Sequence, residues 1–169
     1  MKIMVLPGTI WQVPLMKKIK SMGHELYLAN PVKNKGVYEI ADHFLETDIF
    51  ASDTIISYCK SEEIDIVMSE ECDVATDAVA RYNKALGANC ISEEMADLFT
   101  NKFRMREFCK EQGFNPIPHC LCRTQSEAVE FFRQNGSKLI MKPLDSNASH
   151  GVFVILSEED IAEKFDDTL

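Results

Sequence analysis

Two lysines lie at positions where a charged side chain needs either a chemical role or a route to solvent. Lys102 falls near the centre of an apolar stripe on a helix expected over Glu93–Gln112, and the stripe is formed by Met95, Leu98, Phe99, Met105 and Cys109. A lysine there extends to solvent along its aliphatic stem, pairs with an acid, or points into a polar pocket. Arg106 lies one turn further on, near the same face, so the two cations can share one anion.

The second lysine, Lys142, ends a short apolar run and precedes Pro143. In a strand over Lys138–Pro143, Leu139 and Met141 face one side and Lys142 faces the other. Because proline has no N–H to donate to a strand ladder, pairing ends where Lys142 lies. The strand is therefore expected to present an ammonium group beside a loop, although an exposed strand-end lysine without a function is the alternative interpretation.

The loop that follows, Leu144–Gly151, is built from small and polar residues between two apolar runs. Small side chains leave backbone N–H groups open to phosphate oxygens, and Gly151 permits backbone angles that other residues avoid. A hairpin turn needs only about two to five residues, so a loop of this length is typical of a binding segment. The two lysines and the loop together predict a phosphate-binding site.

The first half of the chain must supply a scaffold, and its pattern alternates strands with helices. Strands are expected at Lys2–Leu6, His24–Ala29, His43–Glu46, Ile64–Met68 and Ala88–Ile91, and helices at Trp11–Met22, Ser52–Ser61 and Val74–Leu86. This alternation predicts an α/β fold with a parallel sheet covered by helices.

The second half has a different character. After the long helix, which Ser92 is expected to cap, the breakers Gly113, Asn115, Pro116 and Pro118 mark a boundary. A strand is expected at His119–Arg123, followed by a helix that ends at Asn135 and begins with a capping box of Thr124 and Glu127. Strands are then expected at Lys138–Pro143 and Gly151–Leu156. A last helix begins with a capping box of Ser157 and Asp160. We expect a βαβ domain over 1–92, a linker helix over 93–115 and a small α+β lobe over 116–169.

The charge, the apolar runs and the cysteines of the chain disfavour several classes of function. The 169 residues carry a formal charge of -9, which disfavours nucleic acid as a partner. No apolar run is long enough to span a membrane and no signal peptide is recognisable, so a cytoplasmic protein with reduced cysteines is expected. Cys120 and Cys122 form a C-x-C pair, for which a metal site is an alternative to the favoured interpretation as small apolar side chains.

The segment from Thr100 to Leu156 resembles the ATP-grasp superfamily of ligases. The motif comprises a helical lysine and arginine, Gly and Pro breakers, a capped helix, a strand ending in Lys-Pro, a small-residue loop closed by glycine, and a further apolar strand. The run from Lys142 to Gly151 is most similar to the biotin carboxylase and formate-dependent glycinamide ribonucleotide transformylase branches. Residues 1–92 resemble the Rossmann-like domain that precedes the ATP-grasp domain in those enzymes, with carbamoyl phosphate synthase as a further similar branch.

The resemblance implies a role for each matched residue. Lys102 and Lys142 would contact ATP phosphates, and the backbone of Ser149, His150 and Gly151 would close over them. In the first domain, the acceptor substrate would lie beside Gly8, Gln12 and Asp73. No residue of the chain is expected to act as a catalytic group or metal ligand.

The same resemblance implies an ADP-forming carboxylate–amine or carboxylate–thiol ligase that works through an acyl phosphate with ATP and Mg²⁺. The partners would be ATP and a small-molecule carboxylate, with a homodimer as one open option. Family members bind magnesium further along the sequence than Leu169, so this chain alone is expected to be inactive, as a fragment or as half of a split enzyme. An asparagine and a Glu-rich region encoded downstream would favour the ligase.

Two alternatives belong to other classes. A non-catalytic nucleotide- or metabolite-binding module would keep the fold without the chemistry. A Rossmann-type dehydrogenase or epimerase is disfavoured because Leu6–Trp11 lacks the G-x-G-x-x-G pattern that a dinucleotide requires. The identity of the acceptor is not readable from the residues.

Overall fold

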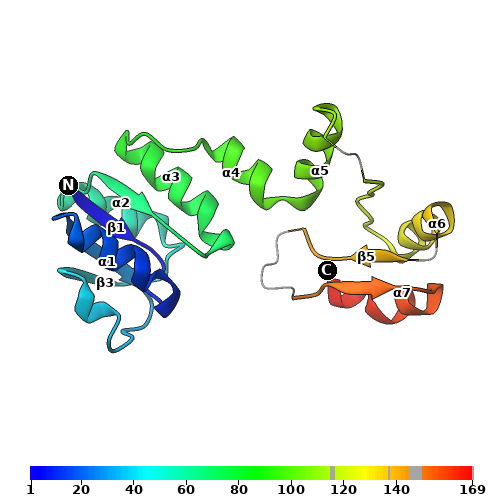
Figure 1. The fold of residues 1–169 in the computed structure, drawn as a ribbon, viewed down its shortest axis with the longest axis horizontal. Coiled ribbons are helices and arrows are strands. Elements are labelled where there is room, and N and C mark those ends of the chain that lie inside the picture. The colour runs from blue at the N-terminus through cyan, green and yellow to red at the C-terminus, as the bar shows by residue number, and fades with distance from the viewer. Residues whose placement is uncertain (115–116, 137, 145–149, 169) are drawn as a thin grey trace. The chain divides into compact units, whose positions relative to one another are not determined.

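A computed structural model describes residues 1–114, 117–136, 138–144 and 150–168 of the chain. The chain forms two compact units, Met1–Asp97 and Leu98–Leu169 (Figure 1). Among the described residues, no helix has the length and apolar character needed to cross a bilayer. The breakers Asn115 and Pro116 lie outside the described residues.

The first unit is the expected parallel sheet. Its four strands are β1 (Lys2–Val5), β2 (Glu25–Asn30), β3 (His43–Glu46) and β4 (Ile66–Met68), in the spatial order β3-β2-β1-β4. Every neighbouring pair runs parallel, with Met4 opposite both Tyr27 of β2 and Val67 of β4. α1 (Val13–Ser21) lies between β1 and β2, α2 (Ser52–Ser61) lies between β3 and β4, and α3 (Thr76–Leu86) follows β4. The 3-10 turn Ile10–Gln12 precedes α1, Tyr38–Ile40 lies between β2 and β3, and Asp73–Ala75 precedes α3.

Alternating residues of β1 and β2 divide the core of this unit into two layers. Met4 and Tyr27 pack with α2 and α3 on one face of the sheet. Ile3 and Leu26 pack with α1 on the other face. Since both faces are covered, the central strands are apolar on both sides, as parallel sheets require.

The outer edge of β4 is covered by one side chain rather than by a fifth strand. Asn83 of α3 is fully buried; its amide oxygen accepts from the Val67 N–H at 2.8 Å, and its amide nitrogen donates to the Val67 carbonyl at 2.8 Å. The strand expected at Ala88–Ile91 was therefore wrong: the Ala88 N–H donates to the Asn83 carbonyl at 2.9 Å, which closes the helix instead of extending the sheet.

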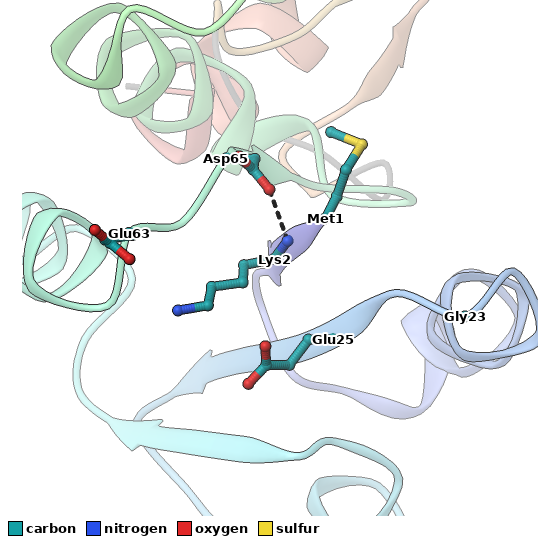
Figure 2. A pocket seen from close by; sticks show the side chains of 6 residues that line it. All are labelled: Met1, Lys2, Gly23, Glu25, Glu63 and Asp65. Atoms are coloured by element: carbon teal, nitrogen blue, oxygen red, sulfur yellow. Dashed lines mark hydrogen bonds between the residues drawn. The ribbon is translucent and has the colours of Figure 1, made fainter.

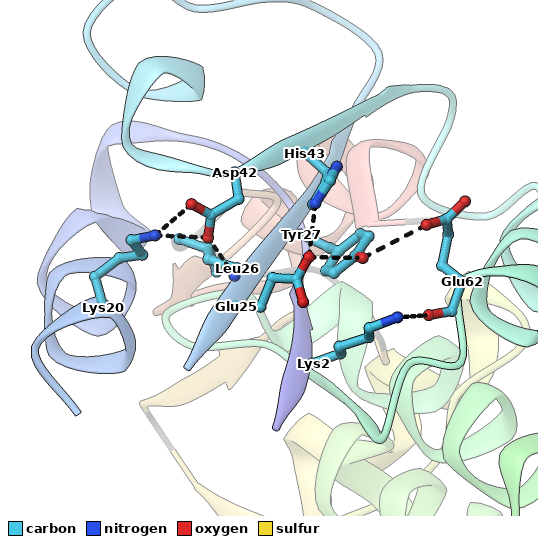
Figure 3. A network of polar contacts seen from close by, with 8 residues as sticks. All are labelled: Lys2, Lys20, Glu25, Leu26, Tyr27, Asp42, His43 and Glu62. Carbon is cyan, nitrogen blue, oxygen red and sulfur yellow. Dashed lines mark hydrogen bonds and ion pairs between the residues drawn. The ribbon is translucent and has the colours of Figure 1, made fainter. Parts of the chain in front are cut away.

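Polar side chains connect the amino ends of the strands (Figure 3). His43 of β3 lies 2.8 Å from a Glu25 oxygen and stacks on the Tyr27 ring at 4.3 Å. The hydrogen bond with His43 holds the pKa of Glu25 below its usual value, whereas desolvation raises the pKa of Tyr27 to about 12. Asp42, just before β3, accepts from the Leu26 N–H at 2.8 Å and from Lys20 of α1 at 2.6 Å. These contacts fasten β3 and α1 to β2.

The second unit contains the helices α4 (Glu93–Thr100, which begins in the first unit), α5 (Lys102–Glu111), α6 (Gln125–Asn135) and α7 (Glu158–Lys164), and the strands β5 (Leu139–Met141) and β6 (Phe153–Ile155). β5 and β6 pair antiparallel, with Met141 opposite Phe153. One face of this pair packs on α6 and α7 through Ala128, Ile155, Ile161 and Phe165. The capping boxes predicted for both helices, Thr124 with Glu127 and Ser157 with Asp160, are confirmed.

Two predictions for this half were wrong. The helix expected over Glu93–Gln112 is divided in two, because Asn101 leaves the helical conformation at φ -82° and ψ 105° and caps α5. The predicted Ser92 cap is confirmed at the start of α4 by its hydroxyl, which accepts from the Met95 N–H at 3.1 Å. The segment His119–Arg123, expected as a strand, has no strand assignment and joins no ladder among the described residues.

We predict that Asn83→Leu lowers the free energy of unfolding by roughly 2–4 kcal/mol, because two buried backbone groups of Val67 lose their partners. Asn89→Leu is the matched control, since Asn89 is an exposed asparagine just beyond the same helix. Chemical denaturation of both variants measures the difference. Equal stability of the two variants would contradict the edge-covering role of Asn83.

The network around Asp42 predicts a stability loss in acid. The Leu26 N–H and then Lys20 hold the pKa of Asp42 below its usual value. A depressed folded-state pKa stabilises the protein above the unfolded value of about 3.9, and this contribution disappears as the pH falls through the folded value. Asp42→Asn should therefore flatten the decline in unfolding free energy as the pH falls from about 5 through the folded pKa. Lys20→Met should flatten it less, and an unchanged slope in both would contradict the assignment.

Candidate functional site

The predicted lysines come together in the second unit. Lys102 is the first residue of α5, and its backbone N–H donates to the Leu144 carbonyl at 3.2 Å. The Lys102 ammonium donates to the same oxygen at 3.0 Å. Lys142 follows the last residue of β5 and lies two positions before that carbonyl. The expectation that Lys102 lies within a continuous apolar stripe was wrong, because the helix begins anew at this residue.

Charge concentrates at this point of the unit. Partial burial lowers the pKa of the Lys142 ammonium, and the charges of Arg106 and then Lys102 lower it further. Arg106 lies one turn beyond Lys102 on α5, so the neighbouring cations come from α5 and from the end of β5. A group of positive charges in a partly desolvated position favours the binding of an anion.

The loop after Lys142 is described at its two ends. Residues 145–149, including the predicted Ser146 and Ser149, lie outside the described residues, whereas His150 is described as exposed within a turn. Gly151 has a φ of +68°, and a Cβ there would lie 2.8 Å from Cγ of Pro143 and 3.1 Å from the Asp167 carbonyl oxygen. Only glycine fits both the backbone angle and the contact, so Gly151 holds the end of the loop against its start.

α5 is also fastened along its length. The His119 ring lies 2.6 Å from a Glu107 oxygen through Nε2 and 2.8 Å from the Ile117 carbonyl oxygen through Nδ1. The ring of Phe103 meets His119 edge-on, with centroids 5.7 Å apart. These side-chain contacts replace the strand ladder expected at His119–Arg123 and attach that segment to α5.

The predicted acceptor residues lie in the first unit, at the carboxyl ends of its strands. A Cβ on Gly8 would lie 2.7 Å from Cγ of Leu28, so only glycine lets the loop after β1 pass so close to β2. Asp73 is exposed at the start of the turn after β4. Open parallel sheets bind ligands at this carboxyl edge.

The third predicted acceptor residue, Gln12, is buried and bound within the chain. Its amide oxygen accepts from the Thr9 hydroxyl at 2.6 Å, and its amide nitrogen donates to the Glu70 carbonyl oxygen. Gln12 therefore ties the loop after β1 to the loop after β4. In this state it shapes the carboxyl edge of the sheet.

A shallow depression on the first unit lies at the opposite edge (Figure 2), and its lining residues are Met1, Lys2, Gly23, Glu25, Glu63 and Asp65. The Lys2 backbone N–H donates to Asp65 at 2.8 Å, and the Lys2 ammonium donates to the Glu62 carbonyl at 2.7 Å. These polar groups are satisfied within the chain at the amino ends of the strands. The depression is thus a poor candidate for the functional site.

Metal ligands are not assembled in the part of the chain that the structure describes: no three His, Cys, Asp or Glu side chains there are grouped to hold an ion. Cys122 packs against the core of the second unit, and burial is the main cause that raises its pKa to about 12. This fits the interpretation of Cys122 as an apolar side chain, whereas Cys120 is exposed and does not fit it.

Sequence reasoning missed two parts of the site. Asn101 was read as part of a helix interior, although asparagine is a poor residue there and a strong N-cap. The Leu144 carbonyl carries no sequence signal, because any residue supplies the same backbone oxygen. The pairing of Lys102 with a residue 42 positions away appears only in the fold.

Comparison with known proteins supports the interpretation of the fold. No protein-family model matches the chain. The phosphoribosylamine–glycine ligase of Methanocorpusculum labreanum is 30% identical over 148 residues, which are 83% of this chain and 34% of that protein. The biotin carboxylase domain of Hydrogenobacter thermophilus 2-oxoglutarate carboxylase has a TM-score of 0.81 at 14% identity, over 99% of this chain and 40% of that chain. The L-amino acid ligase of Bacillus licheniformis has a TM-score of 0.80 at 14% identity, over 96% and 40%.

The chain therefore has the fold of the N-terminal portion of ATP-grasp enzymes, as its sequence resemblance predicted. It spans about a third of the curated relative, 34%, and 40% of each of these two solved structures.

The geometry of Gly151 predicts an unusually costly substitution. Gly151→Ala should lower the free energy of unfolding by more than the roughly 1–2 kcal/mol of a left-handed backbone, because the added Cβ also meets the Pro143 ring. Gly113→Ala is the control, since Gly113 has a φ of +73° and no heavy atom lies within 4 Å of the position that a Cβ would take there. Denaturant unfolding compares the two, and an equal loss would contradict the contact with Pro143.

Proposed function

We propose that the chain is the N-terminal part of an ATP-dependent, ADP-forming carboxylate–amine or carboxylate–thiol ligase, and that its second unit binds the nucleotide phosphates. The observation that carries this proposal is the grouping of Lys102, Arg106 and Lys142, in which burial and then the neighbouring cations lower the pKa of Lys142. Phosphate oxygens would neutralise this charge. The fold shared with ATP-grasp enzymes supplies the chemical context.

Each residue has a distinct proposed contribution. Lys102 and Lys142 donate charged hydrogen bonds to phosphate oxygens, and these are the strong kind of hydrogen bond. The backbone of Ser149, His150 and Gly151 would close over the phosphates, and Gly151 lies where a Cβ would meet Pro143. Phosphoryl transfer depends largely on positioning and charge neutralisation, so these groups would prepare the γ-phosphate for attack by a carboxylate.

The first unit would border the acceptor substrate. Gly8 and Asp73 lie at the carboxyl edge of the sheet, and Gln12 would act by holding two loops of that edge together. In the proposed division, residues 1–92 form the acceptor domain, 93–115 the linker helices and 116–169 the first lobe of the ATP-grasp domain. A small carboxylate, a cytoplasmic location and a homodimer belong to the same proposal.

A second candidate is a nucleotide- or metabolite-binding module without catalysis. It is favoured for the chain by itself, because the grouped cations Lys102, Arg106 and Lys142 would bind phosphate without any further chemical step. The two candidates share the phosphate site and differ in turnover. Hydrolysis of ATP that depends on acceptor would support the ligase, whereas binding without turnover in the full-length protein would support the module.

We predict that Lys142→Ala weakens MgATP binding about 10-fold to 150-fold, since a hydrogen bond to a charged group contributes about 1.5–3 kcal/mol. The same variant of a full-length ligase should lose ATP turnover. Lys138→Ala is the matched control, because Lys138 is an exposed lysine immediately before the same strand. Isothermal titration calorimetry measures both affinities. Equal affinities for Lys142→Ala and the wild type would contradict the phosphate site.

A further inference from the structure

The start of α5 depends on one side chain. Asn101 leaves the helical conformation, and its amide oxygen accepts from the N–H groups of Phe103 at 3.2 Å and Arg104 at 3.1 Å. These are two of the N–H groups that a helix start leaves without a helical partner. The side chain therefore stabilises a break in a segment whose sequence otherwise favours one long helix.

The break changes the partner of Lys102. In an uninterrupted helix the Lys102 N–H would donate to the carbonyl four residues earlier, that of Leu98. With the helix restarted at Asn101, that N–H donates instead to Leu144 at 3.2 Å, and the ammonium of the same residue reaches the same oxygen at 3.0 Å. The cap thus redirects the backbone group that attaches α5 to the chain just after Lys142.

The remainder of α5 is held in the same unit by side chains. Glu107 lies 2.6 Å from the His119 ring, and the Phe103 ring packs against that ring edge-on. A helix fixed at its start and along its length presents Lys102 and Arg106 in a constant relation to Lys142. Charged groups arranged in advance bind an anion without the cost of ordering them.

We propose that Asn101 is a positioning residue of the nucleotide site, which restarts the helix so that Lys102 lies on the Leu144 carbonyl beside Lys142. This inference rests on the proposed phosphate-binding function. Asn101 itself need not touch the nucleotide, because it acts through the backbone of α5. The expected partner of the positioned cations is a nucleoside di- or triphosphate.

The test compares three variants of the 169-residue chain. Asn101→Ala removes the capping oxygen, and Asn101→Ser keeps an oxygen that can cap. Asn135→Ala is the control, since Asn135 is an exposed asparagine at the end of α6. If Asn101→Ala does not fold, Asn101→Gly replaces it, because glycine is tolerated at this cap position. The readouts are the Kd for MgADP by calorimetry and the hydrogen-exchange rate of the Lys102 amide.

We expect Asn101→Ala to bind MgADP roughly tenfold more weakly and to exchange the Lys102 amide faster. Asn101→Gly should show both changes to a smaller extent, because glycine is a better N-cap than alanine. Asn101→Ser and Asn135→Ala should resemble the wild type in both measurements. A purely structural cap would lower thermal stability while the folded variant kept its affinity, and that result would overturn the inference alone. Failure of the wild type to bind MgADP or MgATP would overturn the proposed function together with it.

Discussion

The Leu144 carbonyl is the contact on which the arrangement of the candidate site depends. It accepts from both the backbone and the ammonium of Lys102, and it lies two residues beyond Lys142. Two cations from distant parts of the sequence are therefore attached to one short stretch of backbone. Burial lowers the pKa of Lys142, and the charges of Arg106 and then Lys102 lower it further, which reflects the same proximity. The fold therefore holds several positive side chains close together at this site, although they repel one another.

Much of the fold follows from patterns that neighbouring residues determine. The alternation of strands and helices predicted the parallel sheet, and the caps at Ser92, Thr124 and Ser157 are determined by groups within a few residues of each other. The strand expected at Ala88–Ile91 was wrong for a different reason. The segment at Ala88–Ile91 does not join the sheet because the Asn83 side chain already satisfies the edge of β4. Such a long-range side-chain contact has no periodic signal in the sequence.

Some features of the candidate site were also readable from the sequence, and others were not. Lys142 at the end of a strand was readable because proline stops the ladder there. The position of Lys102 was misread, since the break at Asn101 is stabilised by contacts that the helical pattern conceals. Gln12 stays a predicted neighbour of the acceptor substrate, and the sequence did not reveal that its amide bonds to Thr9 and Glu70. Loop-to-loop contacts of this kind depend on the sheet bringing β1 and β4 together.

The two units thus have different roles in the proposed function. The first supplies a sheet whose carboxyl edge is shaped by Gly8 and Gln12, and the second supplies the gathered cations. Nucleotide binding by the second unit is tested most directly by a titration of the ¹⁵N-labelled chain with MgADP, followed at individual backbone amides. If the second unit binds the phosphates, the largest shifts occur at Lys102, Lys142 and Gly151. Shifts confined to the first unit, or no shifts at all, would contradict it.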